Sequence, residues 1–229
     1  IDPRLGDQEA FVSLCEKAKE YGISLILDGV FNHAGCDSVY YDQYGNYGED
    51  GAYGNKESKY SSWFLFTDEE HKNCECWWGT KDLPNFNKEN KEYQNYIYRD
   101  QASVIRYWMR LGAKGWRLDV ADELTDDFIE GIKQAIVETD PEGILLGEVW
   151  EDASNKVSYG KMRKYLLGTE LDSVMNYPFR TILTGFLCGD IDSKEASRRM
   201  FSLYENYPKE NFYLNLNLVG SHDRGRILT

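Results

Sequence analysis

Residues 23–31 read ISLILDGVF, an almost continuous apolar run of strand length. A strand that is apolar on both faces is typical of a parallel sheet covered by helices on each side. Residues 115–121 (GWRLDVA) and 143–150 (GILLGEVW) have the same character. Shorter apolar stretches predict two more strands, at residues 173–178 and 213–220. The sequence therefore predicts five strands of one parallel sheet.

Helical patterns separate these strands. Apolar residues at i, i+3, i+4 and i+7 predict helices over residues 7–21, 90–111, 125–139, 159–167, 179–187 and 193–207. The alternation of helix and strand fits either an open doubly wound sheet or a (β/α) barrel. No glycine-rich phosphate-binding fingerprint follows a strand. Polar residues end four of the strands, which favours a (β/α)8 TIM barrel, where those ends form one face.

The segment between the first two strands has a different composition. Residues 33–90 are rich in Gly, Tyr, Asn, Asp and Ser and have no sustained period. The segment is long for a connecting loop, so we expect a small inserted subdomain over residues 35–87. Residues 1–34 and 88–229 would then form one barrel portion, because 229 residues suit a single large domain.

The charge balance excludes some classes of partner. The chain has 26 basic and 39 acidic residues and a net charge of −13, which argues against a nucleic-acid partner. No apolar run approaches the roughly 20 residues that span a bilayer, so no membrane partner is expected. Aromatic residues make up 14% of the chain, and either buried rings or sugar-stacking platforms would account for them.

The five cysteines form no regular framework. Their odd number argues against a secreted disulfide scaffold and favours a cytoplasmic location. His71, Cys74 and Cys76 lie close together, but they lack the second pair of ligands that a structural zinc site needs. We therefore expect loop cysteines there and no metal ligands.

Three carboxylates stand at strand ends, namely Asp119, Glu148 and Asp223. The stretch of chain between Asp119 and Glu148 has the length of one βα unit, and the stretch between Glu148 and Asp223 has the length of two. The three side chains would therefore converge at the mouth of one barrel. A single such residue is well explained as a helix cap. Capping explains three of them less well. Paired carboxylates, one ionised and one protonated, are the machinery of glycoside hydrolysis.

Five segments resemble the signatures of the α-amylase family of glycoside hydrolases, and they occur in the family's order. They are residues 28–33 (DGVFNH), 83–87 (LPNFN), 115–121, 147–150 (GEVW) and 221–223 (SHD). The resemblance implies a TIM barrel of which this chain holds about strands 3 to 7, with residues 35–87 inserted after strand 3. It also implies a retaining hydrolase of α-glucans or maltodextrins.

The resemblance also implies a role for each matching residue. Asp119 would be the nucleophile that forms a covalent glycosyl intermediate. Glu148 would be the general acid and then the general base for the attacking water. Asp223 would hold the hydroxyls of the distorted sugar. Arg117 would lie beside Asp119 and keep it ionised by charge pairing.

Other residues would support this centre. His33 and His222 would donate hydrogen bonds to the same sugar. Asp28 is expected to be structural and to hold Arg117 or the strand end. Trp150 fits two roles equally well, a stacking surface for the next sugar or a core residue.

The branch and the metal content follow from smaller details. Residues 116–123 and Ser221 resemble the neopullulanase, cyclomaltodextrinase and amylopullulanase branch, whose members act on maltodextrins, cyclodextrins or pullulan, although Asp122 replaces an Asn common there. Calcium-binding α-amylases carry a His four residues after the nucleophile, where this chain has Glu123. No cofactor is therefore expected, and a calcium ion at Asn32 and Asn87 stays open.

Two alternatives to an active hydrolase are a non-catalytic carbohydrate-binding relative and a piece that is inactive on its own. The three carboxylates argue against the first, because such relatives usually lose one. Five strands are fewer than the eight of a closed barrel, which supports the second. The edges at residues 23–31 and 213–220 would then invite self-association.

Overall fold

A four-stranded parallel sheet forms the centre of the computed structural model, which describes residues 1–48 and 50–227. The strand order is β1-β2-β3-β6, the order of the chain, with bounds Ile26–Gly29, Gly115–Leu118, Ile144–Gly147 and Ser173–Val174. Trp116 pairs with Leu27 on one side and with Leu145 on the other. Gly115 is required at its position, because an added Cβ would lie 2.1 Å from the Ile144 carbonyl oxygen. Four of the five predicted strands are thus present, as shorter elements.

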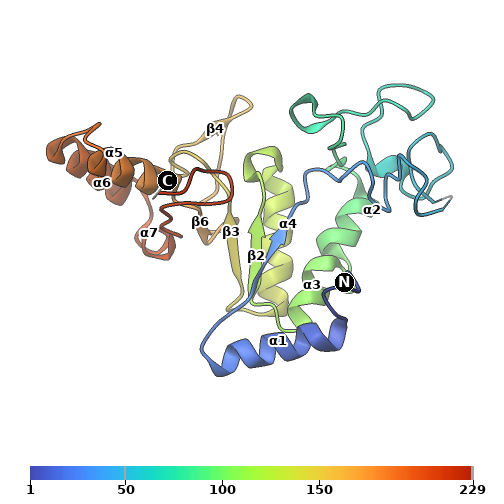
Figure 1. Ribbon diagram of the computed structural model, residues 1–229, viewed down its shortest axis with the longest axis horizontal. Helices are drawn as coiled ribbons and strands as arrows, with labels where there is room; N and C mark the ends of the chain where they lie inside the picture. The colour runs from blue at the N-terminus through green and yellow to red at the C-terminus, as the bar shows by residue number, and fades with distance from the viewer. Residues whose placement is uncertain (49, 228–229) are drawn as a thin grey trace.

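Helices cover the sheet and its lower end. Helix α1 (Gln8–Glu20) begins at Asp7, whose side chain accepts from the Ala10 N–H, and it crosses beneath the strands (Figure 1). Helix α4 (Asp126–Thr139) is capped by Thr125 and contacts α3 (Val104–Arg110) and β3. Its buried face is Phe128, Ile129, Ile132, Ala135 and Ile136. Helices α5 (Tyr177–Leu187) and α6 (Ser193–Asn206) also form as predicted.

The helix predicted over residues 90–111 is interrupted. It consists of α2 (Lys91–Gln94), a π-helical turn (Asn95–Arg99) and α3. Between the turn and α3 the backbone is extended at Asp100 and at Ser103, the N-cap of α3. Asp and Ser favour caps over helix interiors because their side chains compete for backbone groups. The apolar periodicity alone did not register this break.

The prediction of a helix over residues 159–167 is wrong. A short antiparallel hairpin stands there, made of β4 (Val157–Ser158) and β5 (Lys161–Met162). Its two turn residues, Tyr159 and Gly160, have φ values of 51° and 76°. Two successive left-handed residues form the tight turn whose twist matches a hairpin, so Gly160 was the missed signal.

The strand predicted over residues 213–220 is also wrong in extent. Helix α7 (Lys209–Leu214) occupies its first part. Only Leu216 pairs with the sheet, through one parallel bridge to Met175 beside β6. The side chains of Leu216 and Val219 are exposed, and Leu218 is the residue of this stretch that packs against Leu146 of the sheet and Met175 beside it.

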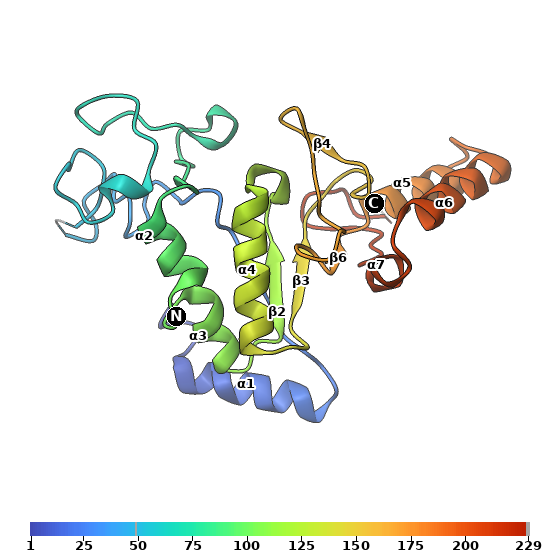
Figure 2. The ribbon, with the colours of Figure 1, turned by 180° about the vertical axis from the view of Figure 1, so that it is seen from behind.

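The segment over residues 35–87 contains two 3-10 turns, Ser61–Trp63 and Trp77–Gly79, and isolated antiparallel bridges. It rises above the carboxyl ends of the strands, as both views show (Figures 1 and 2). Its Phe86 ring stacks on Tyr93 at 4.4 Å, and both rings belong to the large buried apolar cluster of the molecule. Its boundaries as a separate subdomain stay a prediction.

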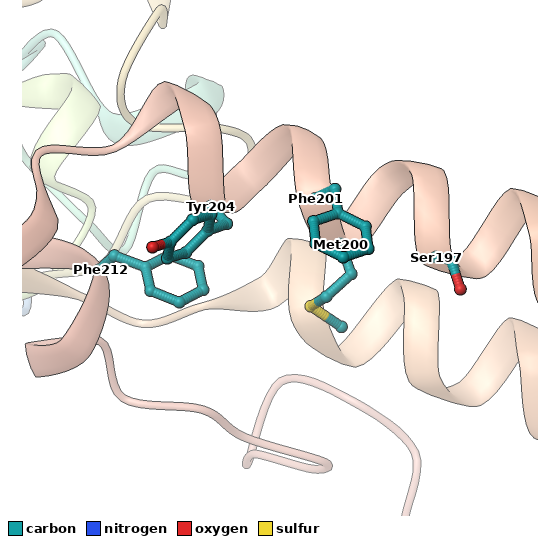
Figure 3. Close-up of a pocket in the computed structure, with 5 residues that line it drawn as sticks. All are labelled: Ser197, Met200, Phe201, Tyr204 and Phe212. Carbon is teal, nitrogen blue, oxygen red and sulfur yellow. The ribbon is translucent and has the colours of Figure 1, made fainter.

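Two apolar surfaces bear on the prediction of self-association, which stays a prediction. Among the described residues, β1 has a paired strand on one side only, and its first residue, Ile26, is exposed. A groove on α6 and α7 is lined by Met200, Phe201 and Phe212 with Ser197 and Tyr204 (Figure 3).

Within the described residues, no helix is both long and apolar enough to cross a membrane. All five cysteines are free thiols.

Candidate active site

Arg117 joins three carboxylates at the carboxyl end of β1, β2 and β3. Its Nη1 lies 2.8 Å from Asp28 Oδ1 and 2.7 Å from Asp119 Oδ1, and its Nη2 lies 3.1 Å from Glu148 Oε2. The guanidinium is largely buried, with 11% of its side chain exposed. The expected contact between Asp28 and Arg117 is confirmed. The single Arg117 guanidinium thus contacts Asp119 through Nη1 and Glu148 through Nη2.

Glu148 is the more buried of these two carboxylates, with 5% of its side chain exposed. Its Oε2 also accepts a 2.7 Å hydrogen bond from the Val120 N–H, and its Oε1 accepts one of 2.9 Å from Trp150 Nε1. The Val120 N–H and the Trp150 Nε1–H thus donate to different oxygens of the Glu148 carboxyl group and fix its orientation.

Val120, the residue after Asp119, has a left-handed backbone with φ 41° and ψ 56°. A β-branched residue is rarely found there, and the conformation costs roughly 1–2 kcal/mol. The turn directs the Val120 N–H at Glu148 while Asp119 still follows β2, with its N–H bonded to the Gly29 carbonyl. Backbone strain of this kind concentrates at functional sites.

Asp223 reaches this cluster through two aromatic residues. The Tyr177 hydroxyl lies 3.5 Å from Asp223 Oδ2 and 3.2 Å from Ser221 Oγ. The Tyr177 ring stacks on Trp150 with centroids 4.5 Å apart. Since Trp150 donates to Glu148, one continuous set of contacts runs from Glu148 to Asp223.

The two candidate histidines lie in different surroundings. His33 is buried, stacks on Trp77 at 4.9 Å, and is held by an antiparallel bridge to Asn85. Burial lowers the pKa of His33, and the charge of nearby Asp119 opposes this effect. His222 is 71% exposed and lies 3.3 Å from Asp223 Oδ2. The structure therefore places His33 near Asp119 and His222 beside Asp223.

Trp150 is partly exposed, but its ring already has neighbours. Tyr177 stacks on it, and the Arg224 guanidinium lies 4.4 Å from its centroid. A sugar that stacked on Trp150 would have to displace one of them. Its function as a stacking surface stays a prediction, and its hydrogen bond to Glu148 is the role that the geometry supports.

Asn32, one of the two residues considered for calcium, contacts a side-chain cation. Lys88 Nζ donates a 2.8 Å hydrogen bond to Asn32 Oδ1, and Asn32 itself is fully buried. Burial lowers the pKa of Lys88, while Glu123 and Glu75 act in the opposite direction. In residues 1–48 and 50–227 no group of three or more His, Cys, Asp or Glu side chains is arranged to hold a metal ion.

Sequence reasoning missed two residues of this centre, Tyr177 and Val120. Tyr177 begins the helix that follows β6, at the same face as the other strand ends, so its position along the chain was an available signal. The left-handed backbone of Val120 had no signal in the residue type, because valine is among the residues that least favour it.

Comparison with known proteins agrees with this arrangement. A family model described as "Alpha amylase, catalytic domain" matches residues 1–229. The chain belongs to the alpha-amylase family. Its sheet and covering helices are accordingly a portion of that family's (β/α)8 barrel.

The curated relatives of this alpha-amylase-family chain include an amylopullulanase from Thermoanaerobacterium saccharolyticum, 38% identical over 258 aligned residues. The match covers 100% of this chain and 19% of that relative, so the chain spans about a fifth of its length. Neopullulanase 2 from Thermoactinomyces vulgaris is 33% identical, with 100% of this chain and 37% of the relative covered.

Solved structures of similar proteins share the fold. The cyclic alpha-maltosyl-(1→6)-maltose hydrolase of Arthrobacter globiformis, in complex with maltose, has a TM-score of 0.83 and 28% identity, covering 100% of this chain and 49% of that one. The Nostoc punctiforme debranching enzyme, soaked with acarbose, has a TM-score of 0.82 and 30% identity, covering 100% and 50%.

Proposed function

We propose that these residues form the catalytic centre of a retaining α-glucoside hydrolase. The observation that carries the proposal is the sharing of Arg117 between Asp119 and Glu148. A retaining mechanism needs two carboxyl groups about 5–5.5 Å apart, and contact with one guanidinium keeps a pair at short range. Asp119 is the more exposed of the two, which suits a group that must touch the substrate.

In the first step, a carboxylate oxygen of Asp119 attacks the anomeric carbon of the α-glucoside. Glu148 gives its proton to the glycosidic oxygen, the bond from that oxygen to the anomeric carbon breaks, and the leaving sugar departs as an alcohol. Arg117 holds the attacking carboxylate in place through its 2.7 Å contact with Asp119 Oδ1.

In the second step, Glu148 is ionised and accepts a proton from an incoming water. The water oxygen bonds to the anomeric carbon, and the ester bond to Asp119 breaks, which restores the carboxylate. Two inversions leave the product in the α configuration. Asp223 accepts hydrogen bonds from hydroxyls of the sugar at the reacting position, and His33 donates one.

The proposed substrates are α-glucans and maltodextrins of the starch, pullulan or cyclodextrin type. Several relatives are named for such activities, among them amylopullulanases, neopullulanase and cyclomaltodextrinases. The chemistry needs no organic cofactor, because two carboxylates carry the proton and the covalent bond. Calcium is not required, since Lys88 already supplies a cation at Asn32.

The test is to incubate the protein with maltotriose, pullulan and a cyclodextrin and to follow the anomeric protons by NMR from the first turnover. We expect α-anomeric product to form first and to mutarotate later. Initial β-anomeric product would overturn the retaining mechanism. Binding of these sugars without any hydrolysis would overturn the proposal for this chain and favour the two alternatives, a non-catalytic carbohydrate-binding relative or a piece that is inactive on its own.

A further inference from the structure

Trp78 is the most unusual aromatic residue of the surface. Its side chain is 83% exposed, more than that of any other large apolar residue among those described. Its backbone is also left-handed, with φ 49° and ψ 27°, and Gly79 follows at φ 75°. Both features cost free energy, and a ring that is this exposed buries little area to offset them.

The loop that carries Trp78 is not a loose one. The Trp77 N–H donates to the Leu83 carbonyl at 3.0 Å, and Cys76 pairs with Pro84 in an antiparallel bridge. Hydrogen bonds close the inside of the loop as well, from the Gly79 N–H to the Cys76 carbonyl and from the Thr80 N–H to the Trp77 carbonyl. The backbone therefore holds Trp78 outward in a defined position.

The same loop is anchored to the candidate active site. The Ala34 N–H donates to the Pro84 carbonyl at 3.0 Å, and His33 forms a bridge with Asn85. The Trp77 ring stacks on His33 with an interplanar angle of 14°, and the Trp78 ring lies 5.5 Å from the Trp77 ring. Three neighbouring rings thus lead from the buried His33 to the exposed Trp78.

We propose that Trp78 is the stacking platform of a further sugar-binding subsite, which holds a glucose unit of an α-glucan chain that extends past His33. This inference rests on the proposed function. A pyranose ring has an apolar face of C–H groups, and an exposed indole offers a large, rigid surface of matching character with negative charge on its face. Strained, exposed residues of this kind persist where a ligand covers them.

The test compares binding of long and short maltodextrins by calorimetry. Asp119→Asn serves as the background so that the sugar is not consumed, and Trp78→Ala, Trp78→Phe and Tyr21→Ala are added to it. Tyr21 is 76% exposed and caps α1, which lies beneath the sheet at the end away from this loop (Figure 1). It controls for the loss of an exposed aromatic ring elsewhere.

We expect Trp78→Ala to weaken maltoheptaose binding about tenfold and to leave maltose binding within about twofold. Trp78→Phe should keep most of the affinity, and Tyr21→Ala should keep all of it. Equal maltoheptaose affinity of Trp78→Ala and its background would overturn the inference. So would a lower melting temperature of Trp78→Ala without lower affinity, because that result assigns the ring to packing.

The failure of the inference and that of the proposed function are distinguishable. If the unsubstituted protein hydrolyses maltodextrins and Trp78→Ala binds them normally, only the subsite is overturned. If the unsubstituted protein neither binds nor hydrolyses any α-glucan, both are overturned together.

Discussion

The Val120 N–H donates a 2.7 Å hydrogen bond to Glu148 Oε2, so the residue after the proposed nucleophile holds the proposed acid/base. This contact requires the left-handed backbone at Val120. A change in the backbone of Val120 should therefore affect both Asp119 and Glu148. Substitutions at Val120 can test the role of its N–H separately from that of its side chain.

Val120→Gly should preserve activity, because glycine adopts the same backbone without steric cost and keeps the N–H. We expect kcat within about threefold of the unsubstituted value and an unchanged or higher melting temperature. Val120→Pro removes the donor and fixes φ near −65°, so kcat should fall by about two orders of magnitude. If Val120→Gly lost as much activity as Val120→Pro, the valine side chain and not its N–H would be the important group.

Arg117→Met should impair both stability and activity. It leaves Glu148 buried without its charge partner, and breaking a buried pair in this way costs about 3–5 kcal/mol. Denaturant titration and kcat measure the two effects. Arg198→Met is the matched control, since Arg198 pairs with Glu195 on the exposed face of α6 and should change neither quantity measurably. Equal losses of stability and activity in the two variants would show that the ion pairs of Arg117 contribute no more than an exposed surface pair does.

Chelation of calcium should leave the melting temperature unchanged. The Lys88 ammonium already binds the Asn32 amide oxygen, and a divalent cation there would be repelled by it. Thermal melts with EGTA and with added calcium chloride test this. A clear rise in melting temperature on adding calcium, lost in Asn32→Ala, would place a calcium ion where we place only Lys88.

Glu170 should make the stability depend on pH. Its side chain is fully buried, neither carboxylate oxygen has a hydrogen-bond partner among the described residues, and burial raises its pKa to about 7. Asp126 and Glu130 raise this pKa further, while Arg163 and Lys164 oppose them. The folded chain thus keeps a proton that the unfolded chain, with a pKa of about 4.3, releases earlier.

The folded state therefore binds more protons between these two pKa values, and stability falls as pH rises through that window. The loss should approach about 3 kcal/mol by pH 8, and Glu170→Gln should remove it. Urea titrations at pH 5 and pH 8 measure the difference for both proteins. The same pH dependence in Glu170→Gln would assign it to another group.

Much of the fold could be predicted because apolar runs specify buried parallel strands. Residues 23–31 and 143–150 contain β1 and β3, and Asp119 and Glu148 follow strand ends as expected. Residues 213–220 are equally apolar, but a short run becomes a strand only when neighbours pair with it, and Leu216 alone finds one. Periodicity could not register the turn at Gly160, because one glycine changes the backbone without changing the pattern.

The residues of the candidate site were likewise only partly predictable from the sequence. Arg117 and its carboxylates were predictable from their places at the ends of strands. The place of Tyr177 after a strand was also an available signal, but its stacking on Trp150 was not. The outward position of Trp78 was not predictable either, because it depends on a loop held by backbone hydrogen bonds, which leave no local pattern.

Covalent trapping tests the central claim most directly, namely that Asp119 is the nucleophile. The protein would be treated with a 5-fluoro-α-glucosyl fluoride, which forms the glycosyl ester and hydrolyses slowly, and then digested and mapped by mass spectrometry. We predict one glucosyl adduct on Asp119, absent in Asp119→Asn. An adduct on Glu148 or Asp223, or hydrolysis of maltodextrin by Asp119→Asn at the unsubstituted rate, would contradict the account.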